Sequence, residues 1–249
     1  MSADFYVLLG SFFLIALIYS SVGFGGGSSY LALLAVMGIS YDVIRPTALL
    51  CNIIVVTGGT YIFYREGKLD FRKAWPFIVA SIPMAFLGGY WKIKEDTFFI
   101  ILGFTLVIAS SLLWLQPKNE KVSGANKPVV NLGLGAGLGF LSGLVSIGGG
   151  IFLSPLLHLL RWDEAKKISA LASFFILTNS ISGLAGQLIQ KPSLDFQFIL
   201  PLLAAVLVGG QIGSRLGARK FKALYIKRIT AGLILVAGIN ILIDHGLFR

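Results

Sequence analysis

The sequence has 249 residues, of which 56% are hydrophobic and only 13% are charged, and its mean hydropathy is +0.84. A soluble domain has about 25% charged residues, so a water-soluble globule is excluded and a polytopic membrane protein is expected. The formal net charge is +10. In a membrane protein this charge indicates cytoplasmic loops near anionic lipid, and nucleic acid is not expected as a partner.

The first uncharged run covers residues 5–41 and contains the stretch SVGFGGGSSY at 21–30. It is too long for one ordinary span of ~20 residues and short for two full spans. Three consecutive glycines, Gly25, Gly26 and Gly27, divide it, and glycine lets the backbone turn sharply. We therefore predict a hairpin in which a full span is followed by a half-helix over 28–40 that begins inside the membrane region.

Three more uncharged runs follow in the first half, at 46–64, 74–91 and 97–117, and each has the length of about one span. Tryptophans lie near the ends of the runs, where amphipathic rings sit at the level of the lipid headgroups. We expect this interfacial position for Trp75, Trp91, Trp114 and Trp162.

The second half repeats this order. A long run at 128–160 contains Gly148, Gly149 and Gly150, which predict a second hairpin with a half-helix over 151–160, and later runs cover 168–190, 196–214 and 229–243. The segments KLDF and SLDF, Pro76 and Pro201, and Gly88 and Gly213 also recur in the same order. We predict a duplication with a first repeat at 1–115, a polar loop at 116–128 and a second repeat at 129–249.

The distribution of Lys and Arg favours inverted repeats. With five segments in each half, one side of the membrane holds 16 Lys and Arg residues, in loops 65–73, 116–128, 161–167 and 215–228, and the other side holds 5. With four segments in each half, the repeats are parallel and the division is 12 to 9. Basic loops tend to remain cytoplasmic, so the 16 to 5 arrangement is preferred, with both termini outside.

The two glycine trios predict an anion site. A half-helix that begins at each trio presents unpaired N–H groups and the positive end of its dipole, and such an end binds anions without a charged side chain. Inverted repeats bring two such ends together near the midplane. The alternative is that the trios only allow close helix packing. We expect packing for Gly133, Gly135, Gly137, Gly139 and Gly143, which have GxxxG spacing.

Polar side chains near the trios are candidate ligands. Ser28 and Ser29 either donate to an anion or cap their own helix, and they have no counterpart after the second trio. Asn52 and Asn179 lie in corresponding spans, and each is expected to be either a substrate ligand or an interhelical hydrogen-bond partner.

Three basic or titratable side chains are weaker candidates. Arg45 and Lys167 precede corresponding spans, and their side chains are expected to snorkel to headgroups rather than to attract an anion. His158 lies in the second half-helix and is interpreted as a hydrogen-bonded residue rather than a proton carrier.

These motifs resemble the TauE/SafE family of membrane proteins. The likeness rests on SSVGFGGGSSYLALL and SGLVSIGGGIFLSPLL, on RPTALLCNI and KKISALASFF, and on the LDF pattern that follows, and it covers nearly the whole chain. The resemblance implies a multi-pass inner-membrane transporter of small, mostly sulfur-containing anions, such as sulfite, sulfonates and thiosulfate.

The side chains themselves favour anion transport. All eleven acids lie at termini, in loops or at span ends, so no carboxylate relay for a cation is visible in the spans. We expect a secondary transporter without cofactor or metal, whose partners are the anionic substrate and membrane lipid. An anion channel is the alternative. A membrane-embedded enzyme is less favoured because two distant histidines, with no acid in a span, do not form a catalytic site.

Overall fold

The computed structural model describes residues 3–115, 128–192, 194–217 and 223–247, and all regular structure in these ranges is helical. The predicted all-α class is therefore confirmed. In chain order the helices are α1 (Ala3–Ser20), α2 (Gly27–Val36), α3 (Tyr41–Arg65), α4 (Phe71–Tyr90), α5 (Glu95–Trp114), α6 (Pro128–Val145), α7 (Gly150–Leu159), α8 (Ala165–Leu188), α9 (Phe196–Gly217) and α10 (Ala223–Leu242), and a π-helical turn follows at Ile243–Leu247.

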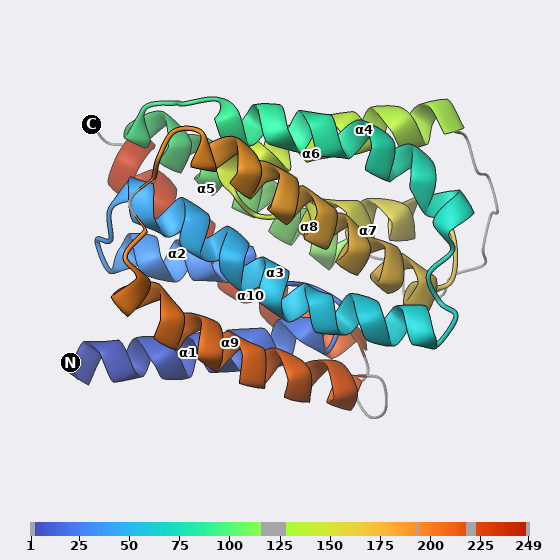
Figure 1. Cartoon of the computed structure of the whole chain (residues 1–249), viewed down its shortest axis with the longest axis horizontal. Helices are drawn as coiled ribbons and strands as arrows, with labels where there is room; N and C mark the ends of the chain where they lie inside the picture. The colour runs from blue at the N-terminus through green and yellow to red at the C-terminus, as the bar shows by residue number, and fades with distance from the viewer. Residues whose placement is uncertain (1–2, 116–127, 193, 218–222, 248–249) are drawn as a thin grey trace.

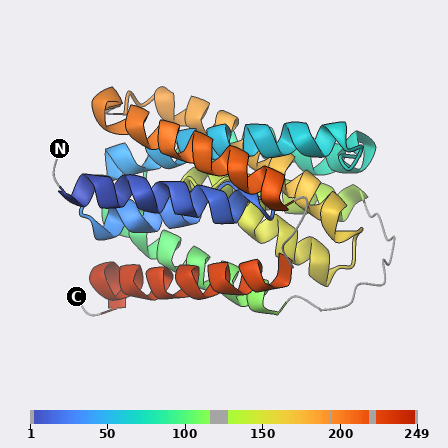
Figure 2. The ribbon, with the colours of Figure 1, turned by 90° about the horizontal axis from the view of Figure 1, so that it is seen from below.

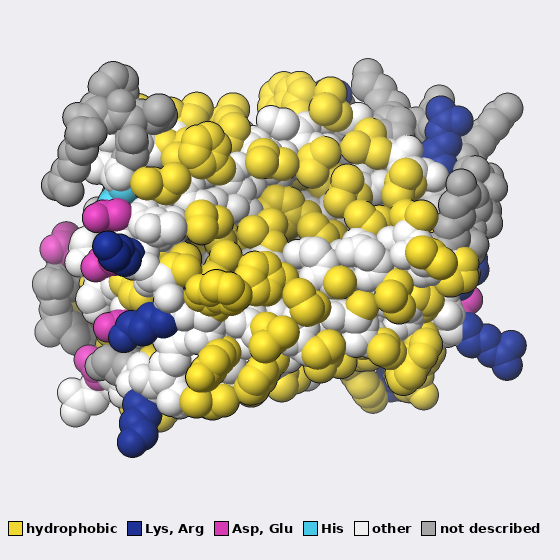
Figure 3. Space-filling view, turned by 90° about the horizontal axis from the view of Figure 1, so that it is seen from above, with side chains coloured by type: hydrophobic (Ala, Val, Ile, Leu, Met, Phe, Trp, Pro, Cys, Tyr) yellow, Lys and Arg dark blue, Asp and Glu magenta, His cyan; other side chains and the backbone are white. Residues whose placement is uncertain are grey.

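Five helices in the described ranges are long and apolar enough to cross a membrane, namely α3, α5, α6, α8 and α9. The helices lie roughly along one axis of the bundle (Figure 1). Figure 3 shows hydrophobic side chains over the middle of one face and charged side chains at both ends of the bundle. This surface pattern is the one expected of a protein whose middle is surrounded by lipid.

The repeated LDF motif marks two equivalent helix starts. Asp70 caps α4 by accepting hydrogen bonds from the N–H groups of Arg72 and Lys73 at 3.0 and 3.3 Å. Asp195 does the same for α9, with the N–H groups of Gln197 and Phe198 at 3.0 and 3.3 Å. A carboxylate at this position satisfies backbone donors that have no partner within the helix. The motif therefore has a structural role in each half.

Helices of one half pack mainly on helices of the other. α4 packs against α6, and α1 packs against α9; α3 also packs against α8, and α5 against α10. Figures 1 and 2 show two of these pairs, α1 beside α9 and α5 beside α10. The core is thus formed between the halves rather than within each of them.

Glycines on one face of α6 allow its close contact with α4. A Cβ atom at Gly135 would collide with the backbone of Phe77, and one at Gly143 would collide with the backbone of Ala85. Gly139 lies in the same row against Ser81. The predicted packing role is therefore confirmed for these three glycines.

The same prediction is wrong for Gly133 and Gly137. Nothing lies within 4 Å of a Cβ atom placed at either position. Both glycines lie two residues from the packed row, so a rotation of about 200° carries them to the opposite face of the helix.

The connections separate into two ends of the bundle. Figure 1 shows the α3–α4 and α7–α8 turns at one end, and the α4–α5 and α8–α9 connections at the other, together with the start of α1. The basic loop predicted at 116–128 lies almost wholly outside the described residues, as does part of the one at 215–228.

Three of the four tryptophans are exposed on the bundle surface, as expected for interfacial residues, but Trp162 is only 6% exposed. Its ring packs edge-on against Phe77, with ring centroids 5.8 Å apart. The interfacial prediction is therefore wrong for Trp162, because α4 covers it.

Candidate anion site at the start of two short helices

The two glycine trios end at the first residues of the two shortest α-helices, each ten residues long. The residue before α2 is Gly26, with φ 88°, and the residue before α7 is Gly149, with φ 77°. Both conformations are left-handed, which is strained for any residue with a side chain. Glycine is therefore required at these positions by the backbone alone.

Asn52 of α3 joins the two trios. Its Oδ1 accepts a hydrogen bond from the N–H of Gly27 at 2.9 Å, and its Nδ2 donates to the carbonyl oxygen of Ile147 at 3.0 Å. A Cβ atom at Gly25 or Gly27 would collide with this amide. Asn52 is fully buried, so one side chain links the start of α2 to the residue that precedes Gly148.

The second trio meets a different side chain. A Cβ atom at Gly148 or Gly150 would collide with Ile176 of α8, and one at Gly148 would also press on Nδ2 of Asn52. Asn179 lies about one turn farther along α8, and its Nδ2 donates to the carbonyl of Phe175 at 2.8 Å, within its own helix. No described contact joins Asn179 to either trio.

The two serines after the first trio have different surroundings. Ser28 is 1% exposed and lines a small cavity beside the trio. Ser29 is turned toward α1, where its hydroxyl forms a hydrogen bond of 2.6 Å with the hydroxyl of Tyr19. The structure therefore places only Ser28 where it can contact a molecule bound beside the trio.

The small cavity lies between the halves. Tyr19, Phe24 and the first trio line one side, and Ile147, Ile151 and Ile176 line the other. Its volume is about 10 Å³, which is room for about one water molecule. Gly148, Gly149 and Gly150 adjoin this region through Ile147 and Ile151, although they are not part of its wall.

Several N–H groups at the two helix starts are unpaired. Gly27 is bonded to Asn52, but the N–H groups of Ser28, Gly150 and Ile151 have no partner in the part of the chain that the structure describes. Ser28 and Ile151 both line the cavity. Unpaired donors and two positive dipole ends at one buried point form an arrangement that attracts negative charge.

Comparison with known proteins assigns the family. Residues 8–241 match the family described as "Sulfite exporter TauE/SafE". The chain belongs to the TauE/SafE family. It is 33% identical over 243 residues to "Probable membrane transporter protein y4hK" of Sinorhizobium fredii (strain NBRC 101917 / NGR234), which covers 93% of this chain and 96% of that protein.

Two relatives from Bacillus subtilis (strain 168) are less similar. "Probable membrane transporter protein YunE" is 24% identical over 92% of this chain and 93% of its own length. "Probable membrane transporter protein YjnA" is 26% identical over 95% of this chain and 98% of its own length. The resemblance inferred from the glycine motifs is thus confirmed. This chain is a multi-pass membrane protein of a transporter family, and not of a family of enzymes.

Some residues beside the trios were not predicted from the sequence. Tyr19, Phe24, Ile147, Ile151 and Ile176 contribute to the cavity wall, yet nothing in the sequence distinguishes these aromatic and aliphatic residues from others of their kind. The only available signal was position, since Ile147 and Ile151 flank the second trio.

The predicted snorkelling of Arg45 is wrong. Its side chain is buried, with 4% of the residue exposed, because hydrogen bonds to Tyr41, Leu144 and Ser146 hold it inside the protein. His158 is also buried, on α7, at 1% exposure.

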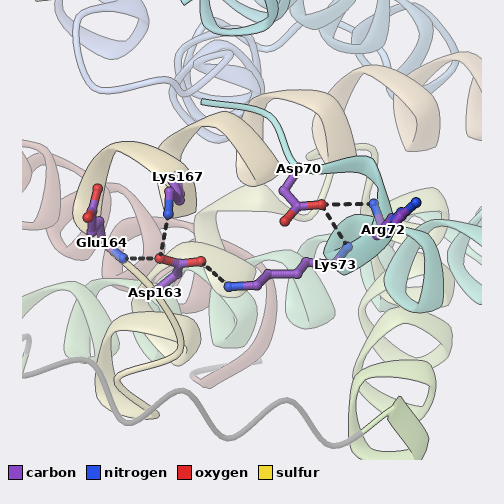
Figure 4. Close-up of polar contacts among 6 residues, drawn as sticks. All are labelled: Asp70, Arg72, Lys73, Asp163, Glu164 and Lys167. Atoms are coloured by element: carbon purple, nitrogen blue, oxygen red, sulfur yellow. Dashed lines mark hydrogen bonds and ion pairs between the residues drawn. The ribbon is translucent and has the colours of Figure 1, made fainter. Parts of the chain in front are cut away.

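Lys167 also interacts with protein rather than with headgroups alone. Its Nζ lies 3.4 Å from Oδ1 of Asp163, and the Nζ of Lys73 lies 2.6 Å from Oδ2 of the same carboxylate (Figure 4). Burial raises the pKa of Asp163, but the hydrogen bonds from Lys73 and from the N–H of Glu164, together with both lysine charges, lower the pKa below its usual value. This cluster joins the start of α4 to the start of α8 at the end of the bundle that carries the α3–α4 turn.

Proposed function

We propose that this chain is a secondary transporter of small sulfur-containing anions of the sulfite, sulfonate or thiosulfate type. The substrate binds where the starts of α2 and α7 meet, between the trios Gly25–Gly27 and Gly148–Gly150. The observation that carries the proposal is that the starts of α2 and α7 meet at one buried cavity, which is lined by Ser28 and Ile151, two residues whose backbone N–H groups have no partner in the described structure. The family description, which names sulfite, supports the class of substrate.

The transporter is proposed to consist of two inverted repeats, 1–115 and 129–249. Each helix of the first repeat then corresponds to the helix five places later. Exchanging each helix for its counterpart turns the contact of α4 with α6 into the contact of α9 with α1, and both contacts are present. The same exchange turns the pair α3 and α8 into itself, and it does the same for α5 and α10. Reciprocal packing of this kind is expected if a two-fold axis relates the repeats, and α2 and α7 are then the half-helices.

An anion is favoured over a cation by the groups that surround the cavity. The residues that line it are glycines, apolar residues, Tyr19 and Ser28, and none of them carries a carboxylate. Buried cations need oxygen ligands of negative charge or several carbonyls. Ser28 supplies a donor to the anion, and Asn52 supplies an amide once its present bonds to Gly27 and Ile147 are broken.

Binding requires that the trios separate. A cavity of about 10 Å³ holds one water and is too small for an anion with four or more heavy atoms. Under this proposal the site is closed in the present arrangement. Because Asn52 bonds to both sides, movement of one repeat against the other would break its bonds and expose the donors, as alternating access requires.

The test uses purified protein in detergent and in sealed liposomes. Thermal stability is measured with sulfite, thiosulfate, methanesulfonate, acetate and chloride, and uptake is measured for each anion that stabilises the protein. We expect stabilisation by at least one sulfur oxyanion and uptake against its gradient when an ion gradient is imposed. If uptake occurs only down the electrochemical gradient of the anion and at the high rate of a channel, the protein is an anion channel. Absence of sulfur-anion binding, or transport of a metal cation, would overturn the proposal.

A further inference from the structure

A polar pocket lies at the end of the bundle opposite the Asp163 cluster. It has a volume of about 240 Å³, and its lining includes Arg45, Lys92, Gln187 and Lys191, with Asp42 as the one acid. The pocket is formed by the start of α3, the α4–α5 connection and the end of α8. Three cations and one acid leave it with a net positive charge, and its size suits an anion far better than the closed cavity does.

The charge of Arg45 is buried without a carboxylate partner. In the described part of the chain no acid lies within ion-pair distance of its guanidinium, which instead donates to the hydroxyl of Tyr41 at 2.7 Å, to the carbonyl of Leu144 at 3.2 Å and to the hydroxyl of Ser146 at 3.3 Å. The guanidinium also lies 4.9 Å from the centre of the Tyr41 ring. Arginine remains ionised when buried, and a buried charge that is offset only by Asp42, beyond ion-pair distance, is costly. A bound anion would compensate it.

Two N–H groups of the Arg45 guanidinium are not used by these hydrogen bonds. A guanidinium carries five N–H groups, and three of them are used, one from each nitrogen. One N–H group therefore remains on each terminal nitrogen, counting described partners only. Two N–H groups on adjacent nitrogens are the donors with which arginine holds two oxygens of one oxyanion.

Gln187 adds a second incompletely bonded group to the pocket wall. It is 2% exposed, its Nε2 donates to Ser146 Oγ at 2.8 Å, and its Oε1 has no partner among the described residues. Because amide oxygen and nitrogen exchange by a 180° rotation, the hydroxyl of Ser146 can instead donate to Oε1. That rotation frees the amide N–H groups of Gln187 for a ligand while Ser146 still accepts from Arg45.

Ser146 connects this pocket with the glycine site. It has φ 61°, a left-handed conformation uncommon for a residue with a side chain, and Arg45 and Gln187 both bond to its hydroxyl. The next residue, Ile147, lines the closed cavity and bonds to Asn52. Ser146, which bonds to two residues of the pocket wall, is therefore adjacent in the chain to a residue of the cavity wall.

The geometry points to a second anion-binding site in this pocket, in which Arg45 and Gln187 hold a small oxyanion or sulfonate and Lys92 and Lys191 attract it. We call it the Arg45 pocket. The inference rests on the proposed anion transport and extends it, because the Arg45 pocket then receives the substrate at one mouth before the trios separate. In the described part of the opposite end, Lys73 and Lys167 already share the carboxylate of Asp163.

The test is a titration of purified full-length protein with sulfite under argon. We compare wild type with Arg45→Gln and with the double variant Lys92→Gln/Lys191→Gln. The control is Lys167→Gln, which removes one positive charge at the other end of the bundle. We expect the Kd to rise at least tenfold in Arg45→Gln and about three- to tenfold in the double variant, and to stay within twofold in the control. Unchanged Kd values in the folded variants overturn the inference. If Arg45→Gln does not fold, the double variant decides the question.

An anionic lipid headgroup offers similar oxygens, so the titration is repeated in phosphatidylcholine nanodiscs with and without phosphatidylglycerol. The same Kd in both assigns the Arg45 pocket to the free anion. A tenfold higher Kd with phosphatidylglycerol assigns it to lipid and overturns the inference.

A final measurement does not depend on transport. In a Cys51→Ala background, Gln190→Cys places a thiol in the wall of the Arg45 pocket. An anionic thiosulfonate reagent should modify it several-fold faster than a cationic reagent of equal size, and methanesulfonate should slow the anionic reaction. If the wild-type protein binds no sulfur oxyanion, the proposed function fails. The difference between the modification rates with the anionic and the cationic reagent then decides by itself whether the Arg45 pocket binds anions. Equal rates for both reagents, with no effect of methanesulfonate, refute it.

Discussion

Replacing Ile151 by proline tests whether backbone donors hold the substrate. Ile151 is the second residue of α7, lines the closed cavity and has an N–H group without a partner in the described structure. Proline is tolerated in the first turn of a helix, because no intrahelical bond is lost there. The substitution therefore removes the donor and should leave the helix in place.

The expected size of the effect follows from the contact that is lost. A hydrogen bond to a charged group contributes about 1.5–3 kcal/mol, which corresponds to an approximately 10- to 150-fold increase in the Kd for the anion. The matched control, Ile151→Val, has nearly the volume of proline but keeps the N–H group. Loss of one methylene in a core costs about 0.5–1.5 kcal/mol of stability, and it should leave the Kd within about threefold of wild type.

The assay is a sulfite titration of both variants, after size-exclusion chromatography has shown that each is monodisperse. Glycine substitutions are less informative here, because Gly26 has a positive φ and a Cβ atom there would press on Ile15 and Tyr30. A valine at that position would disturb folding whether or not an anion binds. If Ile151→Pro and Ile151→Val bind sulfite equally well, the N–H of this residue is not a ligand and the backbone-donor reasoning is refuted.

Three further predictions concern stability and topology. Asp163→Asn should lower the free energy of unfolding by about 1–2 kcal/mol, since its lysine partners are partly exposed. Folding lowers the pKa of Asp163, so this contribution is present above the unfolded-state pKa of about 3.9 and is lost as the pH falls through the folded-state pKa. The Tm difference between wild type and variant should therefore vanish in acid. A Tm difference that does not change with pH would contradict this prediction. Gly143→Leu should lower stability by about 1–3 kcal/mol or prevent assembly, whereas Gly137→Leu should be tolerated, as chromatography and Tm will show. Cysteine at Lys191 should be labelled from outside intact cells and cysteine at Lys68 should not, in a background without the native cysteine; the reverse result would invert the orientation.

Much of the fold could be predicted because membrane insertion constrains the sequence strongly. The absence of charge over about 20 residues identifies a span without knowledge of its neighbours. The trios were equally visible, since consecutive glycines interrupt a helix, and short helices begin at the ends of both. Asp70 and Asp195 belong to the repeated LDF motif of the sequence, and in the structure each caps a helix.

The contacts between distant helices could not be predicted in this way. Nothing in the sequence indicates that Asn52 bonds to both Gly27 and Ile147, because that contact depends on how α3 lies between the halves. The correspondence between Asn52 and Asn179 was approximate, and a shift of a few residues along a helix carries a side chain to another face. The burial of Arg45 could not be predicted for a related reason: it depends on Leu144 and Ser146, which lie about 100 residues farther along the chain.

The pairing of helices across the halves has a consequence for how the chain is made. α1 leaves the ribosome before its main partner, α9, which is completed only 197 residues later, counted from Ser20 to Gly217. At 5–20 residues per second, α1 waits for roughly 10–40 s without the surface on which it finally packs. α4 waits a shorter time for α6. Newly inserted helices must therefore remain loosely associated in lipid, and the order of synthesis differs from the order in which the final contacts can form.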